Sequence, residues 1–157
     1  MLIASNNSWD IMGHIKIFYA DDDEDDLMFF NEAVEQISEA IHSPISLDIF
    51  KDGENLIEGI KNNEEHNSVL FLDINMPLKS GFQFLEEIRN DPKLEDFPVV
   101  MYSTSSDHLI IERCKKLGAS YYAIKPYDFN DLIKLITSFA DINWENHIID
   151  CKNFLYK

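Results

Sequence analysis

The sequence predicts an α/β protein built on a five-stranded parallel sheet with helices on both faces, the doubly wound arrangement. Short apolar runs, typical of buried strands, alternate five times with segments whose apolar residues recur every three or four positions, as on one face of a helix. This alternation favours parallel βαβ units with right-handed crossovers. The length of 157 residues suits one domain with a core of its own.

The predicted strands span residues 15–20, 45–50, 69–73, 98–102 and 120–124. The run VLFLD at 69–73 is the most hydrophobic and is expected at the centre of the sheet, whereas the second run alternates more and is expected near an edge. The apolar stripes that indicate the helices lie within residues 27–41, 56–60, 82–88, 110–117 and 129–139. Asp91-Pro92 and Gly118 are expected to end the third and fourth helices.

Along the chain, the sequence predicts a loose lead-in at 1–13, the α/β domain at 14–140 and a tail at 141–157. The tail could form an additional helix or an ordered arm, and it is too short for a separate output domain. Its apolar residues could provide an interface for a homodimer; they are Trp144, Ile148, Ile149, Phe154 and Leu155.

The charge balance argues against direct binding to nucleic acid. The net charge is −16, from 13 basic and 29 acidic residues, and no basic patch is visible that would meet a phosphate backbone.

No apolar run approaches the roughly 20 residues of a membrane span, and the opening residues lack the pattern of a signal peptide. Cys114 and Cys151 do not have the spacing of a zinc site or a disulfide framework, so the expected location is the reducing cytoplasm.

Polar residues follow four of the predicted strands. Asp21-Asp22 follow the first strand, Asp73 ends the third, Ser103-Thr104 follow the fourth, and Lys125-Pro126 follow the fifth. Ligands of open parallel sheets bind beyond the carboxyl ends of the strands. The sequence therefore predicts that three acids, a hydroxyl and an ammonium gather at one edge of the sheet.

The acids predict a metal site at that edge. Two carboxylates about 4 Å apart repel by about 4 kcal/mol at an effective dielectric constant of 20, and an acid that ends a very apolar strand is costly unless it is paired. A divalent cation would relieve this repulsion, and oxygen ligands in small number suggest Mg²⁺. The remaining acids of the run at 23–26 are assigned to the first turn of the following helix, where the helix dipole favours negative charge.

These residues carry a resemblance to the receiver domains of two-component response regulators, and in particular to the single-domain, CheY-like chemotaxis regulators. Five landmarks support it in order: Asp21-Asp22, Asp73 in the box FLDINMP, Ser103 after VVMY, Tyr122, and Lys125-Pro126. The resemblance covers about residues 14–140. It implies the flavodoxin-like (βα)5 fold with strand order 2-1-3-4-5.

The resemblance implies a phosphorylation site that depends on Mg²⁺. Asp73 would accept a phosphoryl group from a phosphohistidine. Asp22 and Asp73 would bind the metal directly, Asp21 would hold a metal-bound water, and Asn75 would supply its backbone carbonyl. The donor would be a sensor histidine kinase or a histidine phosphotransfer protein, and the output would be a contact with a downstream protein or a phosphorelay. Self-phosphorylation and self-dephosphorylation would be the only catalysis.

The resemblance also implies how the signal would leave the site. Lys125 would pair with Asp73 and then with the phosphoryl oxygens, and Ser103 would donate its hydroxyl to them. Tyr122 would then turn inward and change the face formed by the fourth helix, the fifth strand and the fifth helix. A cis bond before Pro126 is usual in the family. Ser103 stands where Thr is common and Asp21 where Glu is common, but neither change removes an essential atom.

Two other functions stay open on the sequence. A haloacid-dehalogenase-like phosphatase also uses a strand-end aspartate and Mg²⁺, but it needs a second acid two residues after the nucleophile, where this chain has Asn75. A degenerate receiver acting as a constitutive binding module would lack a metal-binding acid or the lysine, and all of these are present here.

Overall fold

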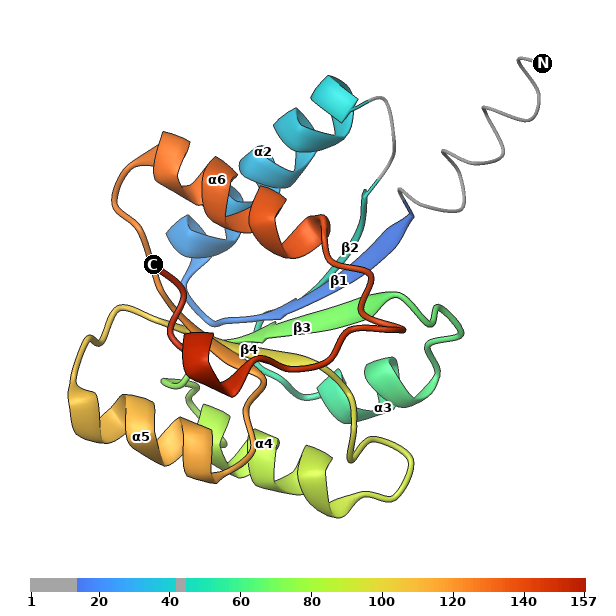
Figure 1. Ribbon diagram of the computed structural model, residues 1–157, viewed down its shortest axis with the longest axis vertical. Coiled ribbons are helices and arrows are strands. Elements are labelled where there is room, and N and C mark those ends of the chain that lie inside the picture. The colour runs from blue at the N-terminus through green and yellow to red at the C-terminus, as the bar shows by residue number, and fades with distance from the viewer. Residues whose placement is uncertain (1–13, 42–44) are drawn as a thin grey trace.

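The protein folds around five parallel strands in the order β2-β1-β3-β4-β5 (Figure 1). The structure, a computed structural model, describes residues 14–41 and 45–157, so the expected lead-in at 1–13 lies outside the described residues. The strands are β1 (Ile15–Ala20), β2 (Ile45–Phe50), β3 (Ser68–Leu72), β4 (Val99–Ser103) and β5 (Tyr121–Ile124). The predicted fold class and strand order are confirmed.

Helices cover both faces of the sheet. α2 and α6 lie on one face, and α3, α4 and α5 lie on the other (Figure 1). The bounds are α2 (Glu24–Ile41), α3 (Leu56–Lys61), α4 (Gly81–Asn90), α5 (His108–Lys116) and α6 (Phe129–Ala140). Each helix buries apolar residues of the stripe that predicted it, so the sheet divides the hydrophobic core into two layers.

The central strands are buried on both faces, which explains their nearly continuous apolar sequence. In β1, Ile17 and Tyr19 belong to the core layer under α2 and α6. Phe18 and Ala20, which alternate with them, belong to the layer under α3, α4 and α5. The two core layers therefore hold the backbone of β1 in place just before the polar edge of the sheet.

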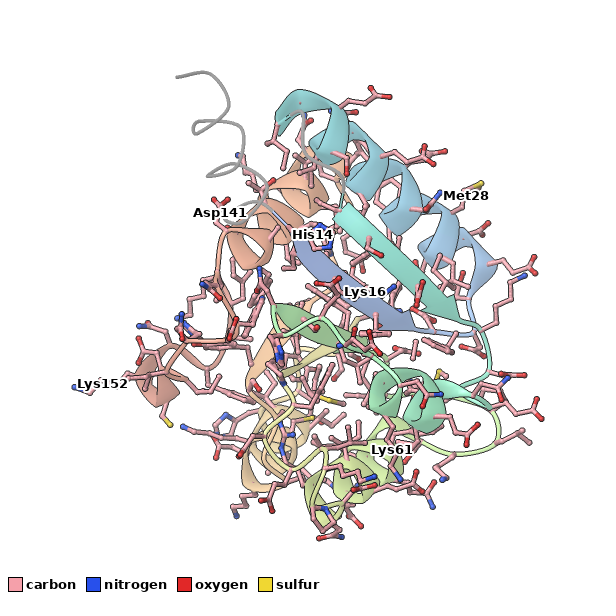
Figure 2. All side chains as sticks on the ribbon, turned by 90° about the vertical axis from the view of Figure 1, so that its right-hand side faces the viewer. His14, Lys16, Met28, Lys61, Asp141 and Lys152 are labelled. Carbon is pink, nitrogen blue, oxygen red and sulfur yellow. The ribbon has the colours of Figure 1, made fainter. Side chains whose placement is uncertain are left out.

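β2 forms one edge of the sheet and is only partly buried, as its alternating sequence predicts. Lys16 of β1 reaches toward this edge (Figure 2). Its Nζ lies 2.8 Å from a carboxylate oxygen of Asp48 and donates to Ser46 Oγ at 3.0 Å. These contacts tie β2 to β1 in the parallel register that pairs Ile15 with Ile45.

Four aromatic rings fill the core beneath the polar edge of the sheet. Tyr19, Phe71 and Tyr102 come from β1, β3 and β4, and Phe30 comes from α2. In the pairs that pack together, the ring centroids lie 4.3 to 5.8 Å apart, and most of these pairs meet edge to face. This packing positions the ends of the three strands relative to one another and to the start of α2.

The tail at 141–157 is an ordered arm with one short helical turn, η1 (Cys151–Asn153). It returns along the free edge of β5, where the N–H of Tyr122 donates to the carbonyl of Phe154 at 2.9 Å. The N–H of Tyr156 donates in turn to the carbonyl of Tyr122 at 2.8 Å, and Leu155 pairs with Tyr122 as a parallel bridge. The tail thus covers the strand edge that β5 would otherwise present.

This course changes what the tail can offer to a partner. Trp144 and Phe154 are buried against the rest of the chain, and the indole N–H of Trp144 donates to the carbonyl of Phe139 at 3.1 Å. Ile148 and Ile149 remain exposed. Of the apolar residues expected to form an interface, two therefore pack inside this chain.

No helix in the described part of the chain combines the length and the hydrophobicity needed to cross a membrane.

Candidate functional site

The carboxyl ends of four parallel strands bring the predicted polar residues to one edge of the sheet. Asp21 directly follows β1, Asp73 follows β3, Ser103 ends β4 and Lys125 follows β5. Backbone hydrogen bonds hold these ends together. The N–H of Asp73 donates to the carbonyl of Ala20 at 3.0 Å, and the N–H of Lys125 donates to the carbonyl of Ser103 at 2.8 Å.

Three carboxylates form a cluster at this edge. Asp21, Asp22 and Asp73 each offer one oxygen, and these oxygens all lie within 4.8 Å of one another. Asp21 and Asp73 are buried, while Asp22 is exposed to solvent. A donor set of oxygens alone, with excess negative charge, fits a hard divalent cation such as Mg²⁺, and these three side chains would hold it.

Lys125 provides the opposing charge. Its Nζ lies 2.7 Å from Asp21 Oδ2, 2.8 Å from Asp26 Oδ2 and 3.3 Å from Asp73 Oδ1. Burial lowers the pKa of this ammonium, but the hydrogen bonds to Asp21 and Asp26 outweigh burial, and the net pKa is raised. Lys125 is therefore positively charged at any physiological pH.

Asp73 has an unusual ionisation. Burial raises its pKa from the ordinary 3.8 to about 6, opposed by the nearby charge of Lys125 and assisted by the charges of Asp21 and Asp22. A buried strand-end acid with a raised pKa beside a lysine is a common sign of a functional site. At neutral pH the carboxylate form, which is the nucleophilic form, still predominates.

Asp21 is fixed more firmly than the other two acids. The hydroxyl of Tyr19 donates to its Oδ2 at 2.5 Å, and the N–H of Asp23 donates to its Oδ1 at 3.0 Å. Tyr19 and Asp21 are two residues apart on an extended chain and so point to the same side. Burial, followed by the charge of Asp21, raises the pKa of the Tyr19 hydroxyl, which therefore stays protonated as a donor.

Ser103, which ends β4, and Tyr122, which lies in β5, both form a hydrogen bond with Ser105 in the loop that follows β4. The buried hydroxyl oxygen of Ser103 accepts a hydrogen bond from the N–H of Ser105 at 3.2 Å. The Tyr122 ring is also buried, and its hydroxyl donates to the carbonyl of Ser105 at 2.7 Å. Both predicted switch residues thus form a hydrogen bond with Ser105, and their role in switching stays a prediction.

The loop after β3 packs closely against the backbone of Asp73 and so helps to position this residue. The N–H of Gly81 donates to the carbonyl of Ile74 at 2.7 Å, and a Cβ atom at Gly81 would overlap the carbonyl oxygen of Asp73. Only glycine allows α4 to begin this close to the site. Asn75 lies exposed in the same loop, and the role of its carbonyl as a metal ligand stays a prediction.

Two residues of the site were not found from the sequence. The sequence predicts for Asp26 only a favourable interaction with the helix dipole, yet its carboxylate contacts Lys125; its place in the first turn of α2, the helix that begins beside the site, was the available signal. Tyr19 was counted only as part of a buried strand.

The cis peptide bond that is usual before this proline in the family is absent before Pro126, because the described residues contain no cis peptide bond.

The sequence profile of the response regulator receiver domain matches residues 17–137. The chain belongs to this family. Response regulator Rcp1 of Synechocystis is 30% identical over 79 residues, which is 50% of this chain and 54% of that protein. The response regulator-like protein APRR1 of Arabidopsis thaliana is 29% identical over 87 residues, which is 55% of this chain and 14% of that protein. The match thus spans about half the length of Rcp1 and a much smaller part of APRR1.

Solved structures show the same fold. The phosphorylated cyanobacterial phytochrome response regulator RcpA superposes with a TM-score of 0.70 and 26% identity, over 87% of this chain and 98% of that chain. The chemotaxis response regulator CheY4 of Vibrio cholerae gives 0.66 and 19%, over 80% and 98%, and shows the fold alone. The tail at 141–157 lies beyond the matched residues of this receiver domain, so its contact with β5 is not part of the family profile.

Proposed function

We propose that this receiver domain is a phosphorylation-controlled switch that accepts a phosphoryl group on Asp73 in the presence of Mg²⁺. The observation that supports it best is the site itself. A buried carboxylate lies in a cluster of three acids that fits a divalent cation, with an ammonium 3.3 Å away. Both features serve a reaction in which negative charge accumulates at one point.

In the proposed reaction, a carboxylate oxygen of Asp73 attacks phosphorus. A new oxygen–phosphorus bond forms, the nitrogen–phosphorus bond of a phosphohistidine breaks, and the imidazole keeps the electron pair. With its pKa near 6, Asp73 is ionised at neutral pH and needs no general base. Lys125 would move onto the phosphoryl oxygens, and the bound cation would neutralise further charge.

Phosphorylation would reach the surface through β4 and β5. Ser103 lies at the end of β4, and its hydroxyl could turn from Ser105 to the phosphoryl group. Ser105 also accepts the hydrogen bond of Tyr122, whose backbone is bonded to the tail. The proposed output surface is therefore the face of α5, β5 and α6 together with the tail, where a downstream protein would bind.

The proposed phosphodonor is a sensor histidine kinase or a histidine phosphotransfer protein. The similar solved structures include a phosphorylated response regulator and a receiver domain activated with BeF₃, which supports the same chemistry here.

A cytoplasmic location is part of the proposal and is supported by the free thiols of Cys114 and Cys151. Homodimerisation through the exposed residues Ile148 and Ile149 also stays a proposal.

Incubation with acetyl phosphate and Mg²⁺ tests the function directly. Intact mass spectrometry should show a gain of one phosphoryl group on the wild type and none on Asp73→Asn. An equal gain on the variant, or none on either protein, would reject the proposal. Steady turnover of a generic phosphate ester would instead favour the phosphatase alternative.

A further inference from the structure

Asp26 contacts the lysine of the site, although it has no role in the reaction proposed above. It lies in the first turn of α2, and its Oδ2 is 2.8 Å from Lys125 Nζ. Its side chain is 37% exposed, whereas that of Lys125 is 9% exposed. The contact thus joins the solvent side of the site to its buried ammonium.

The ammonium of Lys125 is shared among three acids. An ammonium has three N–H donors, and here the distances are 2.7 Å to Asp21, 2.8 Å to Asp26 and 3.3 Å to Asp73. The longest distance leads to the residue that would carry the phosphoryl group. Lys125 must therefore loosen one of its two shorter contacts before it can donate fully to phosphoryl oxygens.

The two shorter contacts differ in kind. Asp21 is buried, is held by Tyr19 and by the N–H of Asp23, and belongs to the cluster that fits a cation, so its charge would be shared with that cation. Asp26 lies outside the cluster and would keep its full charge. When the site is loaded, Asp26 is then the main group that draws the ammonium away from Asp73.

We propose that Asp26 is a positioning residue that restrains Lys125 and thereby lowers the affinity of the site for a phosphoryl group. The inference rests on the proposed function of Asp73. Asp26 weakens the binding of a phosphoryl group in two ways. It competes for the ammonium of Lys125, and its own negative charge repels a phosphoryl group on Asp73.

The test measures the affinity for fluoroberyllate, BeF₃⁻, which takes the place of a phosphoryl group on an aspartate. Calorimetric titrations with beryllium and fluoride at constant Mg²⁺ would compare the wild type with Asp26→Asn, Asp26→Glu and Asp25→Asn. Asp25 is the matched control, because it lies in the same turn, is exposed and loses the same charge, and none of the described ion pairs involves it. Thermal unfolding of each variant would be recorded alongside.

Asp26→Asn should bind BeF₃⁻ about two- to fivefold more tightly than the wild type, the range of a partly exposed ion pair. Asp25→Asn and Asp26→Glu should stay close to the wild type. A purely structural role for Asp26 would lower the unfolding temperature and weaken binding, which would overturn the inference.

The outcomes separate the two proposals. A wild type that shows no response to BeF₃⁻ would mean that the function proposed for Asp73 is wrong, and the inference would fail with it. A wild type that binds, together with Asp26→Asn indistinguishable from Asp25→Asn, would reject the role of Asp26 alone.

Discussion

Asp73 is held in the folded protein at an energetic cost. Its pKa is about 6 in the fold against an ordinary 3.8, so the native state binds this proton more tightly than the unfolded chain does. The carboxylate is nonetheless retained at the centre of the site, next to two other acids and a lysine that is shared with Asp26. Such a residue is placed for reactivity rather than for stability.

The first prediction concerns stability against pH in metal-free buffer. Because the folded pKa is raised, the penalty from Asp73 is absent below pH 4, grows as pH rises and is complete above pH 6. Asp73→Asn removes the penalty and should be more stable than the wild type at pH 7.5, by up to about 3 kcal/mol. Urea unfolding between pH 3.5 and 8 measures the difference, and Asp25→Asn is the control. A difference that does not change with pH would contradict the assignment.

At the scale of elements, the tail and β5 form the least expected contact of the fold. β5 would be an outer strand with unpaired backbone groups on its free edge, and the tail provides partners for the N–H and the carbonyl of Tyr122. Lys115 of α5 lies with its Nζ 5.9 Å from the ring centre of Phe154, and Tyr156 packs against Phe139 of α6. The tail therefore bridges both helices that flank the proposed output strand.

The second prediction is that Phe154→Ala releases the tail locally. The loss of stability should be smaller than the roughly 3–5 kcal/mol usual for a core phenylalanine, because the tail can detach while the sheet stays folded. Hydrogen exchange should become faster at the amide of Tyr122, which bonds to the tail. It should not change at the amide of Lys125, which bonds to Ser103.

Ile148→Ala changes an exposed residue of the same tail and is the matched control. It should leave both amides as they are. Faster exchange at both amides in Phe154→Ala would mean that the tail is needed for the whole of β5.

At the scale of the molecule, the net charge of −16 acts on the fold as well as on solubility. Like charges repel within a compact domain, and the acidic cluster adds a local repulsion among its three carboxylates. A cation can therefore stabilise the protein in two ways, by general screening and by binding in the cluster.

The third prediction separates these two effects. Mg²⁺ should raise the unfolding temperature above that in NaCl of equal ionic strength, by about 5–10 °C at a concentration 100 times the dissociation constant. The excess should largely vanish in Asp22→Asn, which changes an exposed member of the cluster, and persist in Asp25→Asn. Equal shifts in NaCl and Mg²⁺ would argue against a specific site.

Much of the architecture was predictable because it is set by local pattern. The period of the apolar residues located every strand within one residue. The placement of Asp21, Asp73 and Lys125 at one edge followed from the rule that parallel strands end together.

Residue type and local spacing are enough to predict the succession of strands and helices along the chain, the edge at which the polar residues gather and the family resemblance. Three contacts become visible only in the folded protein: Asp26 shares Lys125 with Asp73, Tyr19 fixes Asp21, and the tail closes the edge of β5. These contacts join segments through the way their surfaces pack in space, and no periodicity along the chain records which side chain will face which.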